Sequence, residues 1–317
     1  MKQIIEKFSQ VKVFVIGDVM LDKYTIGTVD RISPEAPVPI MKFERTTMRP
    51  GGAGNTAYNI KSLRGNVEIT GVIGDDDDGK ILKQSFENFD IRSNLFIDKF
   101  WSTITKNRIV AHGHQIVRID KEPNHQISVI DENKIIFDNI NNYEDFDVVV
   151  ISDYDKGTVT DDILDVVMSH FRNKPIIIDP KRKNWRKYSG ATVITPNMKE
   201  LFLVTNSDDI DKLDYLNGSF DIKNILITRG EKGMTLLRRD KDRLDFPSTA
   251  RQVYDVSGAG DTVVSVLALA LGAGAEIEQA VKLSNIAAGL VVEKLGTAAI
   301  TQEELIKHLE ENGYEKD

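Results

Sequence analysis

Short apolar runs that alternate with longer segments of helical period are the feature that most constrains the fold of this chain. Six runs of five to seven residues, rich in Val and Ile, have the pattern of strands buried on both faces. They cover residues 11–16, 67–73, 147–151, 175–179, 191–195 and 222–228. Helical segments follow most of them, and strands that alternate with helices form a parallel sheet covered on both sides. The sequence therefore predicts an α/β fold with three layers around a mostly parallel central sheet.

Two stretches without helical period stand apart from this alternation. Residues 23–48 contain three prolines, and residues 95–120 are rich in Ile, Val and Thr. Both patterns favour edge strands that stand outside the main sheet. We therefore predict a small accessory β-sheet, formed by about residues 23–48 and 95–120, which acts as a lid on a single domain of residues 1–317.

Composition limits the kinds of ligand that this chain can hold. With 41 basic and 49 acidic residues, the 317-residue chain has a net charge of −8, which argues against a broad surface for nucleic acid or anionic membranes. It has no cysteine, so disulfides, a thiolate nucleophile and cysteine-ligated metals are excluded. The first ten residues lack the apolar run of a signal peptide or a membrane span. We expect a cytoplasmic protein that binds a small molecule through local groups.

The stretch YDVSGAGDT at residues 254–262 combines glycines suited to a tight turn with the start of an apolar helix. Backbone amides at the positive end of such a helix form an anion site. Asp261 falls in the first turn, where a carboxylate is poorly placed as a phosphate ligand but well placed to accept a proton from an attacking hydroxyl. The pattern indicates phosphoryl transfer with Asp261 as the base. Helix capping by this aspartate is the structural alternative.

Two further motifs lie at predicted helix starts. Residues 49–55 (RPGGAGN) form a second glycine-rich opening. Asn197 follows a strand and Glu200 comes three residues later, which is the pattern of a capping box. The same pair could hold the water shell of a Mg²⁺ ion that bridges nucleotide phosphates, because Mg²⁺ keeps several waters and few protein ligands. The sequence leaves both roles of the pair open.

Three other patterns approach known motifs and fail on particular residues. Residues 74–81 (GDDDDGKI) nearly match a phosphate-binding P-loop, but Ile81 has no hydroxyl for Mg²⁺ and four aspartates would repel phosphate, so we expect a solvated turn. Val263 occupies the last glycine position of a dinucleotide fingerprint, which disfavours a nicotinamide-dependent dehydrogenase. His112 and His114 have no third ligand nearby in the sequence, so we expect a surface pair.

Taken together, three motifs occur in the order and spacing of a known family. Residues 51–57 (GGAGNTA), the pair Asn197 and Glu200, and residues 255–261 (DVSGAGD) resemble the ribokinase-like, or phosphofructokinase-B, family of carbohydrate kinases. The resemblance covers nearly the whole chain and is strongest to the D-glycero-β-D-manno-heptose 7-phosphate 1-kinases. The stretches that carry this narrower resemblance are residues 17–24, 31–39, 152–157, 179–181 and 195–197. The family has glycine where this chain has Arg64, so we expect the helix end there to differ.

The family resemblance implies roles for individual residues. Asp261 would be the base, and the charge of the phosphoryl group would be stabilised by the amides of Gly258, Ala259 and Gly260. The residues expected to hold sugar hydroxyls are Asp22, Gly51, Gly52 and Asn55. Those expected at the nucleotide, or at its Mg²⁺ through water for the first two, are Asn197, Glu200, Thr228, Gly230, Gly233 and Asn285. The cations expected at the sugar phosphate are Arg31, Arg118 and Lys156, and Lys181 is expected near the transferred phosphate.

The resemblance also implies ATP and Mg²⁺ as cofactors and a homodimer formed through the lid. The expected reaction phosphorylates the anomeric C1 hydroxyl of the heptose 7-phosphate, giving the 1,7-bisphosphate for synthesis of ADP-heptose, a lipopolysaccharide or glycan precursor. Some heptose kinases continue into an adenylyltransferase domain whose histidine motif is absent from these residues, so a separate adenylyltransferase and phosphatase, or a longer chain, is expected. The alternatives are a related kinase for fructose 6-phosphate, a free sugar or a nucleoside, and a regulator that binds nucleotide and sugar without turnover.

Overall fold

A nine-stranded sheet forms the centre of the protein in the computed structural model, which describes residues 1–123, 143–213, 215–294 and 298–314. The strand order is β13-β12-β11-β10-β9-β8-β1-β4-β5. The strands are β1 (Lys12–Gly17), β4 (Asn66–Gly74), β5 (Arg92–Asp98), β8 (Val148–Ser152), β9 (Ile176–Asp179), β10 (Val193–Ile194), β11 (Asn224–Thr228), β12 (Met234–Arg238) and β13 (Lys241–Phe246). Neighbours from β11 to β5 pair in parallel, and only β12 and β13 are antiparallel. The predicted, mostly parallel sheet is confirmed.

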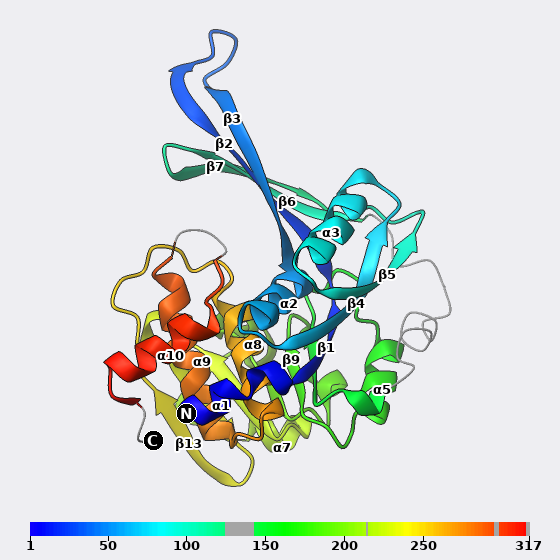
Figure 1. Ribbon diagram of the computed structural model, residues 1–317, viewed down its shortest axis with the longest axis vertical. Helices are drawn as coiled ribbons and strands as arrows, with labels where there is room; N and C mark the ends of the chain where they lie inside the picture. Colours follow the sequence, from blue (N-terminus) through cyan, green and yellow to red (C-terminus); the bar gives the residue numbers. More distant parts are fainter. Residues whose placement is uncertain (124–142, 214, 295–297, 315–317) are drawn as a thin grey trace.

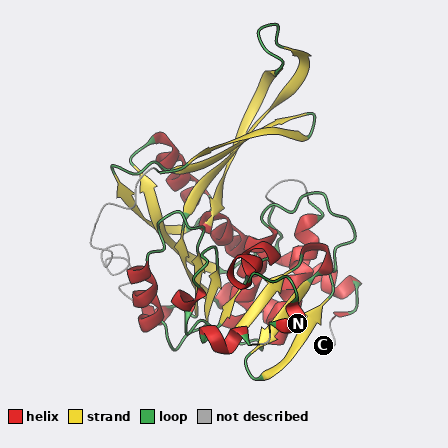
Figure 2. Cartoon of the chain, turned by 180° about the vertical axis from the view of Figure 1, so that it is seen from behind, coloured by secondary structure: helices red, strands yellow, loops and turns green. Residues whose placement is uncertain are grey.

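Helices cover both faces of this sheet (Figures 1 and 2). They are α1 (Lys2–Glu6), α2 (Ala53–Ser62), α3 (Asp77–Asn88), α5 (Asp161–His170), α6 (Met198–Thr205), α7 (Leu216–Phe220), α8 (Ala259–Gly272), α9 (Ile277–Val292) and α10 (Gln302–Glu311). None of these helices, within the ranges given above, is long and apolar enough to cross a membrane.

Alternating side chains of β1 show how the sheet divides the core. Val13 and Val15 pack into the cluster that contains residues of α2, α8 and α9. Phe14 and Ile16 pack into a second cluster, with residues of α5, α6 and α7. Side chains in a strand point to opposite faces in turn, so an uninterrupted apolar run supplies both cores. The three-layer prediction follows from this pattern and is confirmed.

A four-stranded accessory sheet projects from the body as a long, twisted ribbon (Figure 1). Its order is β3-β2-β6-β7, with β2 at Val19–Ile32, β3 at Pro39–Gly52, β6 at Ile104–Ala111 and β7 at His114–Lys121. One part of the sequence-based range was assigned wrongly: residues 95–98 belong to β5, which pairs in parallel with β4 in the main sheet. A parallel edge strand and a strand of a separate sheet have the same short β-branched pattern, so local sequence does not distinguish them.

The acidic stretch 75–78, expected to form a solvated turn, is a bend at residues 75–76 that leads directly into α3, with Asp75 and Asp77 exposed. Asp76 is the N-cap of α3, and its carboxylate accepts a hydrogen bond from the amide of Gly79 (2.9 Å). Asp78 forms an ion pair with Lys23 of the accessory sheet. Carboxylates at a helix start are stabilised by the free amides and the helix dipole. This explains the aspartates without a phosphate or a metal.

Helix α2 ends with a residue in the left-handed region, at the position where the family has glycine. Arg64 adopts φ 67°, and its amide donates to the carbonyl of Lys61 (2.9 Å). A side chain in this conformation costs roughly 1–2 kcal/mol relative to the right-handed helical one. The expected difference at this helix end is therefore a strained residue within the same kind of turn.

Gly17 and Gly218 offer a matched pair of substitutions to alanine. A Cβ at Gly17 would lie 2.1 Å from the carbonyl oxygen of Ser152, on the adjacent strand, whereas a Cβ at Gly218 would meet no atom within 4 Å. We expect Gly17→Ala to lower the free energy of unfolding by about 1–3 kcal/mol, because the two strands must separate. Gly218→Ala, inside α7, should be neutral or stabilising. Urea unfolding measures both, and equal effects would contradict this packing.

Candidate active site

A buried carboxylate lies at the carboxyl edge of the parallel sheet. Asp261, in the first turn of α8, is 7% exposed. It accepts hydrogen bonds from Asn55 Nδ2 (2.6 Å), the Tyr154 hydroxyl (3.0 Å) and Thr56 Oγ1 (3.3 Å). Burial raises the pKa of Asp261 from 3.8 to about 6, against the opposing effect of these hydrogen bonds. A carboxylate with this pKa is mostly ionised at neutral pH and accepts protons more readily than an exposed aspartate.

The start of α8 has the form of an anion site. Gly258, the N-cap, adopts φ 82° and provides no side-chain cap. A Cβ at Gly260 would meet no atom within 4 Å, so the backbone there is open to a ligand. The first amides of a helix have no acceptor within the helix, and the helix dipole makes this end positive. The stretch 258–260 is therefore suited to a phosphate group directly beside Asp261.

Asp22 and the glycines of β3 lie on the accessory-sheet side of Asp261. Asp22 is 5% exposed and pairs with Arg108 of β6 (Nη1 to Oδ1, 2.6 Å). A Cβ at Gly51 would lie 2.4 Å from the Asp22 carboxylate, and Gly52 adopts φ 56° at the start of α2. The structure thus brings Asp22, Gly51 and Gly52 to the same edge as Asp261. Asn55, expected at the sugar, is instead hydrogen-bonded to Asp261 itself.

Asp18 organises the loop after β8, a role that the sequence analysis missed. Its fully buried carboxylate accepts hydrogen bonds from the amides of Tyr154 (2.9 Å), Lys156 (3.0 Å) and Thr158 (2.9 Å). This arrangement holds the loop so that the Tyr154 hydroxyl reaches Asp261. The conspicuous signal was an aspartate directly after the first buried strand, where ligands of parallel sheets bind. Its partners are more than a hundred residues away and could not be identified from spacing.

Asn197 and Glu200 form the capping box of α6. Asn197 Oδ1 accepts from the amide of Glu200 (3.0 Å), and Glu200 Oε2 accepts from the amide of Asn197 (2.9 Å). The other oxygen of Glu200 accepts from Lys181 Nζ (2.7 Å). Asp179, at the end of β9, lies close enough for the charges of Asp261 and Glu200 to add to burial in raising its pKa. The capping role is confirmed, and both carboxylate oxygens of Glu200 accept hydrogen bonds, one from the amide of Asn197 and one from Lys181.

The other residues expected at the nucleotide lie beyond this capping box. Thr228 ends β11 and forms an isolated bridge with Asn197. Gly230 and Gly233 adopt positive φ in the turn between β11 and β12. Asn285 Nδ2 donates to the carbonyl of Pro247 (2.7 Å) and lines a cavity of about 580 Å³. Through this hydrogen bond, α9 contacts the loop around Pro247, which follows β13.

Of the three cations expected at the sugar phosphate, one lies far from the site and two are ion-paired. Arg31 is exposed near the tip of the accessory hairpin, nine residues of strand from Asp22, or about 30 Å. Arg118 makes a two-pronged contact with Asp120 (2.8 and 2.9 Å). Lys156 Nζ donates to Glu122 (2.8 Å). The length of β2 carries Arg31 away from the site, whereas Arg118 and Lys156 are held in ion pairs. Neither feature is visible in the sequence.

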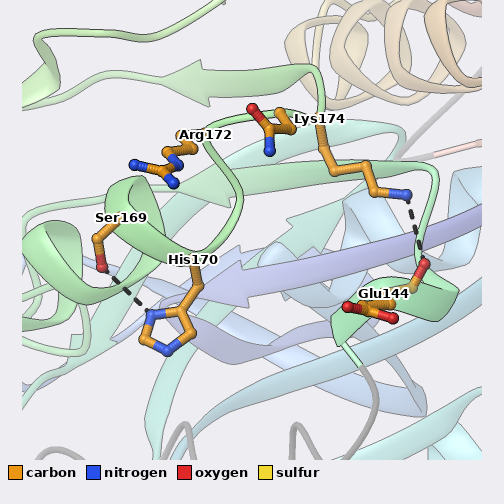
Figure 3. Close-up of a pocket in the computed structure, with 6 residues that line it drawn as sticks. Glu144, Ser169, His170, Arg172 and Lys174 are labelled. Atoms are coloured by element: carbon orange, nitrogen blue, oxygen red, sulfur yellow. Dashed lines mark hydrogen bonds between the residues drawn. The ribbon is translucent and has the colours of Figure 1, made fainter.

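A second surface pocket lies at the amino ends of the strands, where α5 ends and β9 begins (Figure 3). Ser169 Oγ lies 3.2 Å from His170 Nδ1, and Lys174 Nζ donates to the carbonyl of Glu144 (3.3 Å). All of the labelled side chains are exposed or half-buried. Ligands of parallel sheets bind at the carboxyl ends of the strands, so the edge that carries Asp261 is the candidate active site.

Asp261→Asn removes the buried charge and keeps the side-chain shape. Because the folded-state pKa of Asp261 is about 6 rather than 3.8, the wild type should lose stability relative to the variant as pH rises from about 4 to 6, by up to roughly 3 kcal/mol. Above this window the difference should stay constant. Urea unfolding across the pH range measures it, with Asp240→Asn, an exposed aspartate, as control. A difference that is independent of pH would contradict the raised pKa.

Comparisons with known proteins agree with this geometry. The family model described as pfkB family carbohydrate kinase matches residues 10–304. The bifunctional protein HldE of Shewanella denitrificans is 39% identical over 327 residues, which cover 99% of this chain and 67% of the relative. HldE of Photobacterium profundum is 40% identical over 322 residues, covering 99% and 67%. The chain thus spans about two thirds of the length of these relatives.

Solved structures share the fold at low sequence identity. A ribokinase from Arabidopsis thaliana, complexed with ribose and ATP, has a TM-score of 0.71 at 19% identity and covers 94% of this chain and 98% of its own. Phosphofructokinase-2 from Escherichia coli, in complex with substrates and products, has a TM-score of 0.75 at 18% identity, with coverage of 94% and 98%. These likenesses establish a ribokinase-like fold. With the family match over most of its length, this chain belongs to the pfkB family of carbohydrate kinases.

Proposed function

We propose that this sugar kinase uses ATP to phosphorylate the anomeric C1 hydroxyl of D-glycero-β-D-manno-heptose 7-phosphate, giving the 1,7-bisphosphate. The observation that carries the proposal is the buried Asp261 beside the start of α8, where the helix dipole is positive, with Asp22 on its other side. Relatives named HldE, together with the stretch 31–39, favour the heptose over other sugars. Because the chain matches about two thirds of those relatives, their other activities are not transferred to it.

The reaction needs a base on one side of the acceptor hydroxyl and positive charge on the other. Asp261 takes the proton as the hydroxyl oxygen attacks the terminal phosphorus of ATP, and the bond from that phosphorus to the ADP oxygen breaks. The amides of Gly258, Ala259 and Gly260 stabilise the charge on the phosphoryl group in flight. Asp22, near the backbone of Gly51, orients the sugar through its hydroxyls.

The nucleotide is proposed to extend from α8 toward the capping box of α6. Thr228, Gly230, Gly233 and Asn285 would line its site. Mg²⁺ would neutralise phosphate charge, held through water by Asn197 and Glu200. The carboxylate of Glu200 fits this role because it lies next to Asp179, at the carboxyl ends of the strands. Half-exposed Lys181 can exchange its contact with Glu200 for a contact with phosphate, which frees that oxygen of Glu200. Lys181 would then face the transferred phosphate.

We further propose that the accessory sheet is a lid through which two copies associate. Large apolar side chains are exposed on this sheet and on the turn between β2 and β3, and patches of this kind mark interaction sites. They are Ile32, Val38, Phe43, Met48, Ile116, Val117 and Ile119. A second copy would cover this surface. We also propose that the reaction takes place in the cytoplasm. A separate adenylyltransferase and phosphatase, or further domains of a longer chain, would complete ADP-heptose synthesis.

The central test is ADP release by the purified protein with Mg-ATP and a panel of acceptors. We expect a strong preference for heptose 7-phosphate over fructose 6-phosphate, ribose, fructose and adenosine, with the new phosphate on C1. Asp261→Asn should lower kcat at least about a hundredfold while ATP binding persists, because the lost group acts in the transition state.

Other results of the panel are equally informative. Preference for another acceptor would contradict the heptose assignment and keep the role of Asp261. ATP and sugar binding without any turnover would favour a regulator over an enzyme. Near-normal turnover by Asp261→Asn would show that another group accepts the proton.

Glu200→Gln tests the metal role of the capping box. Gln keeps an oxygen for the amide of Asn197, so α6 should remain capped, but the charge that attracts the hydrated ion is lost. We expect half-saturation to require severalfold more Mg²⁺, measured by titration at saturating ATP. An unchanged titration would leave the pair with its capping role alone.

Ile119→Lys tests association through the accessory sheet. Ile119 of β7 is 56% exposed, and a charge there would be buried without a partner in the dimer. Sedimentation of the wild type should give a dimer, and Ile119→Lys a monomer. Phe202→Lys, at an exposed apolar residue of α6, is the control and should leave the dimer intact. A wild-type protein that is monomeric at about 10 μM would contradict the proposed dimer.

A further inference from the structure

Lys106 of β6 lies next to the candidate active site, close to Asp22 and to Tyr154. It is opposite Asp22 in the parallel pairing of β2 and β6. Its ammonium nitrogen is 5.3 Å from the centre of the Tyr154 ring, and the Tyr154 hydroxyl donates to Asp261 (3.0 Å). Lys106 is thus one side chain away from the proposed base and next to the proposed sugar ligand. The sequence analysis did not identify it.

The ammonium of Lys106 has no acidic partner among the described residues, unlike the other cations around it. Arg108 is paired with Asp22, Arg118 with Asp120 and Lys121 with Asp76. Lys106 is half-buried, and this desolvation lowers its pKa although the charge of Asp22 opposes the effect. Cations removed from water are normally paired. An unpaired ammonium at this place is suited to an anion supplied by a ligand.

The position of Lys106 indicates which anion it binds. The transferred phosphoryl group is assigned to the amides of α8, on the helix side of Asp261. Lys106 belongs to the accessory sheet, on the side where Asp22 holds the sugar. Because Lys106 is opposite Asp22 and contacts the ring of Tyr154, which is hydrogen-bonded to Asp261, a sugar held by both carboxylates would lie near the Lys106 ammonium. A negatively charged substituent of that sugar would therefore find its partner there.

We propose that Lys106 binds the phosphate ester of the sugar substrate and so selects sugar phosphates over free sugars. This inference rests on the proposed sugar-kinase site. It replaces Arg31, Arg118 and Lys156, which are remote or paired, as the source of positive charge for that phosphate. Lys106 acts in substrate binding, and its removal should affect the affinity for the sugar phosphate far more than the chemical step.

The test is calorimetric binding of D-glycero-β-D-manno-heptose 7-phosphate, and of the same heptose without phosphate, to the full chain. Lys106→Met keeps the aliphatic stem and removes the charge. We expect affinity for the heptose 7-phosphate to fall roughly 10- to 100-fold, as for loss of a charge-assisted hydrogen bond. Affinity for the unphosphorylated heptose should change less than about twofold, and Lys106→Arg should recover part of the loss.

Controls and turnover separate this inference from the proposed function. Lys42→Met, at an exposed lysine of the same sheet, should bind both sugars like the wild type, and melting curves verify that all variants are folded. Equal losses for both sugars, a raised KM for ATP, or no preference of the wild type for the phosphorylated sugar would overturn the role of Lys106. Wild-type protein that binds heptose 7-phosphate through Lys106 but does not turn it over would refute only the proposed kinase reaction on this sugar.

Discussion

Burial of one ionised carboxylate is the interaction on which the architecture of the site depends. Keeping Asp261 away from water raises its pKa to about 6, and the cost is limited by hydrogen-bond donors that two separate parts of the chain supply. Helix α2 provides Asn55 and Thr56, and the loop after β8 provides Tyr154. That loop is held in turn by Asp18, at the end of β1. The almost wholly buried α8 fixes Asp261 relative to all of them. A buried base that retains its charge thus requires α2, α8, β1 and the loop after β8 to be correctly placed relative to one another.

Charge is distributed so that an acidic protein can hold anions at particular points. The net charge of −8 excludes a general attraction for phosphate. Amides at the start of α8 supply positive potential without any side chain, and most nearby cations are already neutralised, as Arg108 is by Asp22. Lys106 differs because it is half-buried and without an acidic partner in the described residues. The two proposed phosphate positions differ accordingly, because one is made by backbone amides and the other by a side chain.

The accessory sheet links the site to the outside of the molecule. Strand β2 begins and strand β3 ends at the site, where they carry Asp22 and Gly51, and each extends over 14 residues. Their near ends carry the polar groups around the sugar position, and the sheet also exposes large apolar side chains such as Phe43 and Ile119. Association through those side chains would hold the distant ends of the strands and stiffen the near ends. Substrate binding and assembly would then depend on one element.

Local pattern was sufficient for part of this picture. The alternation of apolar runs and helices predicted the parallel sheet, and the glycines before Asp261 predicted the open helix start, because both depend on neighbours in the chain. The same reasoning misplaced residues 95–98, since pairing partners are not encoded locally. The contacts that complete the site join residues 107 positions apart for Tyr154 and Asp261, and 140 apart for Asp18 and Thr158. Only the tertiary structure could decide these contacts, and which cations are already paired, because side chains acquire such neighbours only when distant strands meet at one edge of the sheet.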